Sequence, residues 1–345
     1  MSKELAKADA PRHVRVLLLG GTIACFINEK GESTVVNIAD YVKTFHALDD
    51  AVRISVKSFS RLDGYETKIS DLVNVSEELK RTLREDAADG IVVVMGTNVM
   101  EEAAFSINLL VRTDTPIVFT GAMRIPEARS ADGAGNLVSA IAAAASGACR
   151  ELGAIVVFND EIHSADYVRK LHPLNPGAFG SEFPLGYIAE GTPSVRTRPV
   201  RRLMPWLEAK TPPKDVLLYS SYLGDTGKLL DCVETMGYEG VVVEGTGGGS
   251  VAEWVFERLE RIHARMPVVV ATRIGAGDVM TGTYGNDYGM PRYCIEHGYL
   301  MAGQLDGRKA RLLLTFLLIS ECTPEQIAES FRMYSKAYIP GAGGK

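Results

Sequence analysis

The chain has 345 residues, of which 46% are hydrophobic and 23% charged, with 34 glycines and a formal net charge of -6. This length favours two domains, and the composition is that of an ordinary globular protein and excludes a disordered or fibrous one. The chain is acidic and has no block of Lys or Arg, so we expect it to bind neither nucleic acid nor an anionic membrane. A small-molecule partner is favoured.

The N-terminus and the cysteines indicate the compartment. Residues 1–12 form a polar tail without the apolar core of a signal peptide, and no apolar run approaches the length of a membrane span. The cysteines are scattered and have no C-x-x-C spacing, which is typical of reduced thiols. The histidines never pair at metal-ligand spacing. We therefore expect a cytoplasmic protein without a metal or another cofactor.

Short apolar runs alternate with helical stretches in the first half of the chain. Rich in Val, Ile and Leu, these runs predict parallel strands covered on both faces. They are 14–19, 91–95, 116–120 and 154–158. Ser76–Ala88, with Ser76 as its cap, and Asn136–Ala145 are predicted helices. The alternation predicts an α/β fold whose larger, catalytic domain, residues 13–193, holds a doubly wound, mainly parallel sheet.

A segment rich in Pro, Arg and Lys, residues 194–214, predicts a linker, because its prolines interrupt any regular element. A smaller C-terminal α/β domain, residues 215–345, is expected after it. Near its end Thr323 is predicted to cap a helix in which Pro324 takes the first position and Gln326 completes a capping box. The predicted strands of this domain are 216–220, 240–244 and 267–272.

Two of the predicted strands are followed by the same dipeptide, Gly21-Thr22 after the first and Gly96-Thr97 after the second. In open parallel sheets, ligands bind beyond the C-terminal ends of the strands where the strand order switches, so both hydroxyls are expected to face one crevice. The glycines allow a sharp turn and leave backbone N–H groups free to stabilise an oxyanion. One Gly-Thr often only closes a strand, but two in consecutive units indicate a substrate site.

The same glycines do not fit a nucleotide site. The segment Gly20-Gly21-Thr22-Ile23-Ala24-Cys25 lacks the G-x-G-x-x-G spacing of a dinucleotide fold. A P-loop of the form G-x-x-x-x-G-K-[ST] does not occur anywhere in the chain. We therefore set nucleotide binding aside.

Around the two turns the chain reads Leu19-Gly20-Gly21-Thr22-Ile23-Ala24 and Met95-Gly96-Thr97-Asn98-Val99-Met100-Glu101-Glu102. These segments resemble the T-G-G-T-I-A turn and the H-G-T-D-T-M-E-E segment of the bacterial-type L-asparaginase and glutaminase family. The resemblance covers nearly the whole chain. Further counterparts are Phe119-Thr120-Gly121-Ala122-Met123-Arg124, Ser130-Ala131-Asp132-Gly133, Phe158-Asn159-Asp160, Gly245-Thr246-Gly247-Gly248-Gly249 and Lys309-Ala310-Arg311.

The resemblance implies an amide hydrolase in which a threonine attacks a side-chain amide, ammonia leaves and water releases the acid. Thr22 corresponds to the threonine usually assigned as nucleophile, and Thr97 to a second threonine that acts with a lysine and an aspartate. The resemblance implies that this lysine is Lys170, because Asp166-Tyr167-Val168-Arg169-Lys170 matches a family segment of the form R-D-V-T-K. A buried lysine with a lowered pKa can serve as the base for a hydroxyl. The expected substrate-binding residues are Gly21, Ser70, Gly96, Asn98 and Ala122.

Three departures from the family pattern bear on the substrate. Asn98 replaces the aspartate that normally holds the α-ammonium of the substrate, and residues 25–36 lack the usual tyrosine. The loop that normally presents an asparagine to a neighbouring subunit reads Gly248-Gly249-Ser250. A neutral amide suits a substrate whose amine is absent, acylated or part of a larger molecule. Which threonine attacks stays open.

Three functional hypotheses remain. The first is an asparaginase-type amidohydrolase with altered substrate selection, and the second is an authentic L-asparaginase or glutaminase. The third is a catalytically weak binding subunit, or a partner subunit that delivers ammonia in an amidotransferase complex. Because the family forms its sites between subunits, the resemblance also implies a homodimer or homotetramer.

Overall fold

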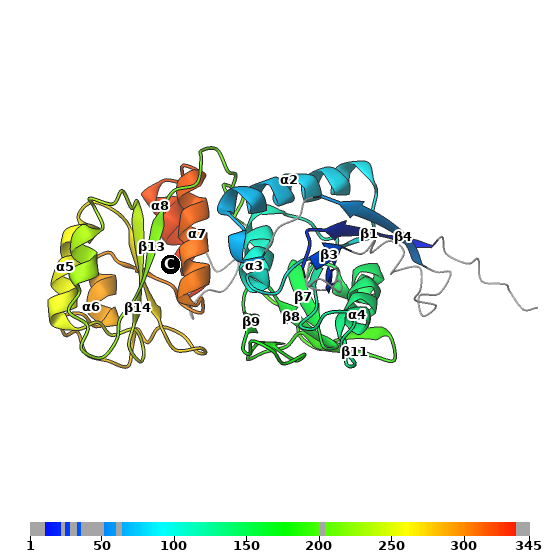
Figure 1. Ribbon diagram of the computed structural model, residues 1–345. Helices are drawn as coiled ribbons and strands as arrows, with labels where there is room; N and C mark the ends of the chain where they lie inside the picture. The colour runs from blue at the N-terminus through cyan, green and yellow to red at the C-terminus, as the bar shows by residue number, and fades with distance from the viewer. Residues whose placement is uncertain are drawn as a thin grey trace, which may run out of the picture. The chain divides into compact units, whose positions relative to one another are not determined.

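The computed structural model describes residues 11–21, 25–27, 33–35, 52–59, 64–200 and 204–335. The chain forms two compact units, Met1–Arg201 and Arg202–Lys345, and each is a sheet covered by helices (Figure 1). The predicted α/β fold, with a larger N-terminal and a smaller C-terminal sheet, is confirmed. Within the described ranges, no helix combines the length and the apolar character that a bilayer span requires.

An eight-stranded sheet forms the centre of the first unit, in the order β12-β11-β8-β7-β6-β5-β1-β4. The strands β4, β1, β5, β6 and β7 are parallel, and the remaining three are antiparallel to their neighbours. All residues of β5 and β7 are buried, as expected for parallel strands between two helical layers. The strands are β1 (Arg12–Leu18), β4 (Val52–Ser58), β5 (Gly90–Val94), β6 (Ile117–Thr120), β7 (Ala154–Phe158), β8 (Glu161–Ser164), β11 (Gly186–Ala189) and β12 (Thr192–Val195).

Helices cover both faces of this sheet: α4 (Gly133–Ala145) on one, and α2 (Ile69–Glu85) and α3 (Met100–Leu110) on the other (Figure 1). The prediction that a helix begins after Ser76 is wrong, because α2 begins at Ile69. The Ser76 hydroxyl donates a 2.7 Å hydrogen bond to the carbonyl of Val73 inside the helix and caps nothing. The helix start is instead marked by Asp71, whose carboxylate accepts the backbone N–H of Lys68 at 2.8 Å.

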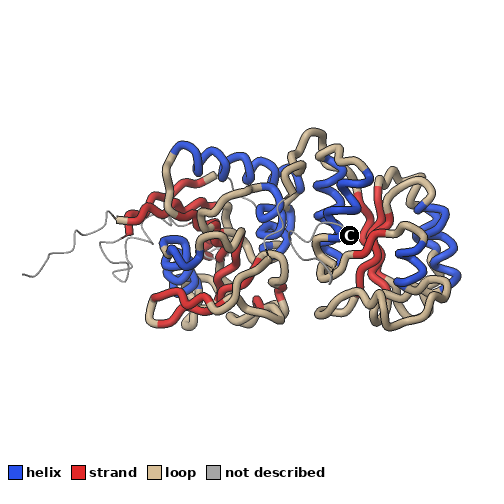
Figure 2. Tube along the Cα trace, turned by 180° about the vertical axis from the view of Figure 1, so that it is seen from behind, coloured by secondary structure: helices blue, strands red, loops and turns tan. Residues whose placement is uncertain are grey.

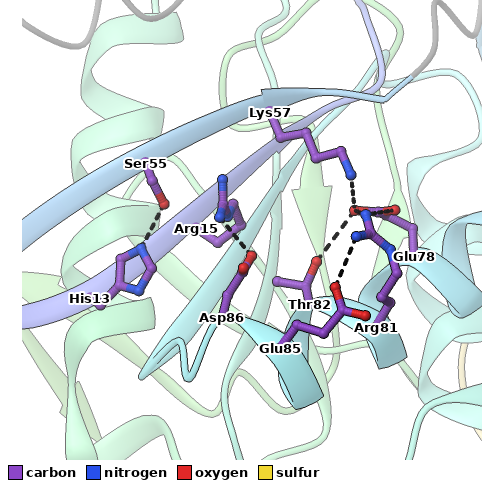
Figure 3. Close-up of polar contacts among 9 residues, drawn as sticks. All are labelled: His13, Arg15, Ser55, Lys57, Glu78, Arg81, Thr82, Glu85 and Asp86. Carbon is purple, nitrogen blue, oxygen red and sulfur yellow. Dashed lines mark hydrogen bonds and ion pairs between the residues drawn. The ribbon is translucent and has the colours of Figure 1, made fainter.

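Charged side chains hold α2 against β4, as Figure 3 shows. The buried carboxylate of Glu78 accepts a 2.7 Å bond from Lys57 on β4 and a 2.6 Å bond from Arg81 on its own helix. Burial raises the pKa of Glu78, but the bonds from Arg81 and Lys57 outweigh it and hold the pKa below its ordinary value. The ion pair of Arg15 and Asp86, at 2.6 Å, joins β1 to the end of α2. These contacts fix the strand that leads to the short 3-10 helix η2 (Gly64–Glu66).

A tight hairpin joins β7 to β8 and was not predicted. Asn159 and Asp160 form its turn with φ values of 49° and 62°, a left-handed conformation that Asn and Asp adopt more readily than most residues. The chain then forms the two-residue strand β9 (Arg169–Lys170), which pairs with β10 (Phe179–Gly180). Near the end of the unit, Arg196 and Thr197 donate backbone hydrogen bonds to Leu185, so the first residues of the expected linker lie against the sheet.

The second unit has a parallel four-stranded sheet, β13-β14-β15-β16, between two helical layers. Figure 2 shows its strands in red with helices on both sides. The predicted capping box is confirmed, because Thr323 accepts the N–H of Gln326 at 3.3 Å and Gln326 accepts that of Thr323 at 3.0 Å. The elements are β13 (Val216–Ser220), β14 (Gly240–Gly245), α5 (Glu253–His263), β15 (Val268–Thr272), α6 (Pro291–Glu296), β16 (Leu300–Met301), α7 (Gly307–Ile319) and α8 (Pro324–Arg332).

Candidate active site

The strand order of the first unit switches between β1 and β5. The chain passes from β1 to β4 on one side and then returns to β5 on the other side. Leu18 lies opposite Val94, and Leu19 donates its N–H to the carbonyl of Val94 at 2.9 Å, so both strands end at one place. The residues that follow them therefore reach the edge at which ligands bind in open parallel sheets.

Glycines bring three loops into backbone contact at this edge. Gly21 has φ +99°, and a Cβ atom placed on it would lie 2.4 Å from the backbone nitrogen of Gly96. A Cβ atom on Gly96 would lie 3.6 Å from the Cα of Gly64 and 3.7 Å from that of Gly21. The turn after β1, the turn after β5 and the helix η2 thus meet at these glycines. The expectation that the hydroxyls of both Gly-Thr turns face one crevice involves Thr22, which lies outside the described residues.

This contact predicts a large effect of a small substitution. Gly21→Ala should lower the free energy of unfolding by about 3 kcal/mol, because the methyl group meets backbone and the φ value is strained for alanine. Urea denaturation followed by circular dichroism measures the change. Gly135→Ala is the matched control, since a Cβ atom on Gly135, within α4, meets nothing within 4 Å. The control should be neutral or stabilising by up to about 1 kcal/mol, and equal effects of the two changes would contradict the steric argument.

The loop after β6 forms another wall. A Cβ atom on Gly121 would lie 2.5 Å from the carbonyl oxygen of Met95 and 3.5 Å from Cγ2 of Thr97. The side-chain amide of Asn136 donates a 3.0 Å hydrogen bond to the Gly121 carbonyl and holds this loop. Ala122 was predicted to bind substrate, but its side chain is 1% exposed and packs in the core against α4. The residue as a whole is buried, and its contact with a substrate stays a prediction.

Thr97 and Lys170 form the polar centre of the site. Lys170, on β9, donates a hydrogen bond from Nζ to Oγ1 of Thr97 over 2.8 Å. Thr97 is 7% exposed and stands between the end of β5 and the start of α3. The two residues are 73 positions apart in the chain. The contact was expected only from the family resemblance.

Burial lowers the pKa of the Lys170 amine, and the nearby carboxylate of Glu101 offsets part of this effect. A lysine with a lowered pKa is more often neutral near pH 7 and can accept a proton from a hydroxyl. Hydrogen bonding to Thr97 places the amine where such a transfer can take place. The pair can thus handle a proton in an acyl-transfer reaction.

Of the other predicted site residues, the structure describes Asn98 and Ser70 but not Thr22. Asn98 is exposed directly after the buried Thr97, and a Cβ atom on Gly64 would lie 3.4 Å from its Cβ. Ser70 is half-buried in the first turn of α2, and its contact with a substrate stays a prediction. Thr22 lies outside the described residues, immediately after Gly21.

Glu101 was not predicted as a site residue. Its carboxylate, 3% exposed in the first turn of α3, accepts a hydrogen bond from the backbone N–H of Lys170. The sequence contained one signal for it, the position of Glu101 in the Met-Glu-Glu end of the segment that follows Thr97. That signal does not identify the partner, because the contact spans 69 positions.

The second unit carries its own Gly-Thr turn, Gly245-Thr246, at the end of β14. Thr246 and Ser250 exchange backbone hydrogen bonds, 2.8 Å from the Thr246 N–H and 2.9 Å from the Ser250 N–H. A Cβ atom on Gly248 would lie 2.8 Å from the Cβ of Met280, so side chains of this unit pack closely against the glycine. The segment expected to resemble the family loop is thus an ordered turn at the C-terminal edge of the second sheet.

Comparisons with known proteins cover both units. Residues 13–201 match the family described as Asparaginase, N-terminal, and residues 215–331 match the Glutaminase/Asparaginase C-terminal domain. L-asparaginase 2 of Bacillus subtilis (strain 168) is 29% identical over 95% of this chain and 88% of its own. L-asparaginase of Bacillus licheniformis is 30% identical over 90% of this chain and 96% of its own. The crystal structure of a probable cytoplasmic L-asparaginase from Campylobacter jejuni covers 93% of this chain and 99% of its own, with 29% identity and a TM-score of 0.82.

Proposed function

This chain belongs to the asparaginase family and is a hydrolase of C–N bonds in linear amides, and from that premise we propose how it works and what it selects. A threonine hydroxyl attacks the carboxamide carbon of a small substrate, and the Thr97–Lys170 pair handles the proton. The observation that carries the proposal is the 2.8 Å hydrogen bond from Lys170 to the buried Thr97, beside the exposed Asn98.

The proposed reaction has two steps. In the first, the Thr22 oxygen adds to the amide carbon and its proton passes to the Thr97–Lys170 pair. The C–N bond then breaks, and ammonia leaves with a proton returned by the pair. In the second, water adds to the resulting ester, the carboxylic acid is released and the Thr22 hydroxyl is restored. Backbone N–H groups of the glycine turns are suited to stabilise the negative oxygen in both steps.

Asn98 supports altered substrate selection. An aspartate at this position would attract an α-ammonium group by charge, whereas the amide of Asn98 offers only neutral hydrogen bonds. We therefore propose that the preferred substrate is a carboxamide whose amine is absent, acylated or part of a larger molecule. Gly64 lies beside Asn98, since a Cβ atom placed on this glycine would be 3.4 Å from the Asn98 Cβ.

Ammonia release from a panel of amides tests this selection. The panel contains asparagine, glutamine, their N-acetyl derivatives and simple carboxamides. We expect wild type to favour amides without an α-ammonium. We expect Asn98→Asp to raise the kcat/KM for free asparagine relative to that for its N-acetyl derivative by about 10- to 100-fold, which is the factor that one charged hydrogen bond contributes. Asn98→Ala is the control that removes the amide without adding charge. No turnover of any amide by the folded protein would overturn the proposal.

The second candidate is an authentic L-asparaginase, favoured by the names of the relatives in Bacillus subtilis and Bacillus licheniformis. It predicts that free asparagine is the preferred substrate of the wild-type protein. It also predicts that Asn98→Asp changes the kcat/KM for asparagine less than about twofold. The same panel therefore decides between the two candidates.

We further propose that the protein acts in the cytoplasm as a homodimer or homotetramer on a small amide. The support is the family to which the chain belongs and the probable cytoplasmic L-asparaginase to which it is similar in structure. Light scattering after size-exclusion chromatography measures the assembly. A monomer at micromolar concentration with full activity would contradict the oligomer.

A further inference from the structure

Glu101 is a carboxylate in a place where carboxylates are rarely found. It lies in the first turn of α3, four positions after Thr97, and is 3% exposed. Burying a carboxylate is costly unless hydrogen bonds or opposite charges compensate it. A buried acid this close to the candidate site therefore needs an explanation.

The partner of Glu101 is the same residue that contacts Thr97. Its carboxylate accepts the backbone N–H of Lys170, while the Lys170 side chain donates to Thr97. The short segment from Thr97 to Glu101 thus holds Lys170 at both ends, by its backbone and by its amine. Further along α3, Asn108 donates to the carboxylate of Asp166 at 2.9 Å, which ties down the turn before β9.

The charge of Glu101 also reaches the amine. The charged residues nearest to Lys170 in the chain or on α3 are Glu101 and Glu102 on the helix, Arg169 on β9 and Asp166 before it, and Lys170 is paired with the uncharged Phe179 on β10. Of these charges, that of Glu101 acts on the pKa of Lys170 and raises it, against the larger lowering by burial. The position next to Thr97 carries no charge, because it is Asn98.

We propose that Glu101 is a positioning residue of this site. Its carboxylate fixes the backbone of Lys170 opposite Thr97 and supplies the negative charge that acts on the Lys170 amine, next to a position where the family aspartate is absent. The inference rests on the proposed function, because Lys170 matters only if it exchanges a proton with a threonine. Glu101 thus supplies a negative charge near Lys170, which the neutral Asn98 does not supply.

Glu101→Gln separates charge from hydrogen bonding. Glutamine keeps an oxygen that accepts the Lys170 N–H, but it removes the negative charge. Lys170 must be neutral to accept a proton, and its pKa falls further when the charge of Glu101 is removed. The ascending limb of the pH profile of kcat/KM should therefore move to lower pH by about one unit. Glu102→Gln removes the same charge from the next residue and is the matched control, with its limb expected at the wild-type pH.

Glu101→Asp makes the opposite change and keeps the test valid if the Gln variant does not fold. The charge stays, but the side chain is shorter by one methylene and reaches the Lys170 N–H less well. We expect its kcat to fall about tenfold while the ascending limb stays within roughly 0.3 pH unit of wild type. A limb that moves as far in Glu101→Asp as in Glu101→Gln would contradict the separation of roles.

The protonation of Lys170 is also measured without turnover. Trace acetylation across a range of pH, followed by mass spectrometry of the peptide that contains Lys170, reports the fraction of neutral amine. If wild type hydrolyses no amide, the proposed function fails while this titration still tests Glu101. If Glu101→Gln lowers stability but leaves both the titration of Lys170 and the pH profile at their wild-type positions, Glu101 is merely structural and the inference is overturned.

Discussion

Lys170→Met should lower kcat by about 1000-fold while the protein stays folded. Methionine has a similar length and fills the space of the aliphatic stem, but it has no amine to accept the proton of a threonine. Loss of a general base typically costs between about 100- and 10,000-fold. Ammonia release at saturating substrate measures the rate, and circular dichroism with a thermal melt verifies the fold.

A lysine outside the site serves as the control for this change. Lys80, on α2, forms a 2.7 Å ion pair with Glu77, whose side chain is 61% exposed. Exposed pairs contribute little, so Lys80→Met should keep kcat within about a factor of two of wild type. If Lys170→Met retains more than about a tenth of the wild-type kcat, Lys170 is not the proton acceptor.

Thr97→Val is the second change with a large expected effect. Valine matches threonine in shape but lacks the hydroxyl that accepts the bond from Lys170. We expect kcat to fall by about 100- to 1000-fold, and Thr97→Ser, which keeps the hydroxyl, to stay within about tenfold of wild type. Because the two residues act as one unit, the double variant Thr97→Val with Lys170→Met should be no slower than Lys170→Met alone.

The site of acylation distinguishes the two threonines. With a slowly hydrolysed substrate, mass spectrometry of the quenched enzyme should find the acyl group on the peptide that contains Thr22. An acyl group on Thr97 would make Thr97 the nucleophile and Lys170 its direct base.

The double variant has its own contradicting outcome. If Thr97→Val and Lys170→Met reduce kcat multiplicatively when combined, Thr97 and Lys170 act separately.

The elements that the sequence predicts well are those whose burial is uniform. Residues 154–158 were predicted as a strand with the bounds that the structure has, because both faces of this strand are covered and its residues are continuously apolar. The capping box of Thr323 was also predicted, since all its partners lie within one helical turn. Local patterns of this kind need no tertiary information.

The features that the sequence did not predict depend on partners far along the chain. Ser76 looks like a helix cap, but packing of α2 on the sheet continues the helix through it to Ile69. The Asn159-Asp160 turn gave a local signal for a hairpin, which the expectation of a parallel strand concealed. The local signal for Glu101 does not identify its contact with Lys170, because Lys170 lies 69 positions away on β9.

The candidate site was predicted in part for the same reason. The two Gly-Thr turns are local motifs, and the rule for parallel sheets predicts that they lie at one edge, where the structure brings Gly21 and Gly96 into contact. The contact of Thr97 with Lys170 came from the family resemblance, since residue spacing does not predict a bond across 73 positions. Ala122 was also taken from the resemblance; it is 1% exposed among core residues, and its contact with a substrate stays a prediction.

The open backbone beside Asn98 has a consequence for how such enzymes diverge. Asparagine and aspartate have nearly the same volume, and the neighbour of this side chain is Gly64, at 3.4 Å from a Cβ placed on the glycine. An exchange of one for the other at position 98 therefore changes the charge of this exposed side chain and hardly its size. Under the proposed function, one codon change at position 98 alters selectivity by charge alone.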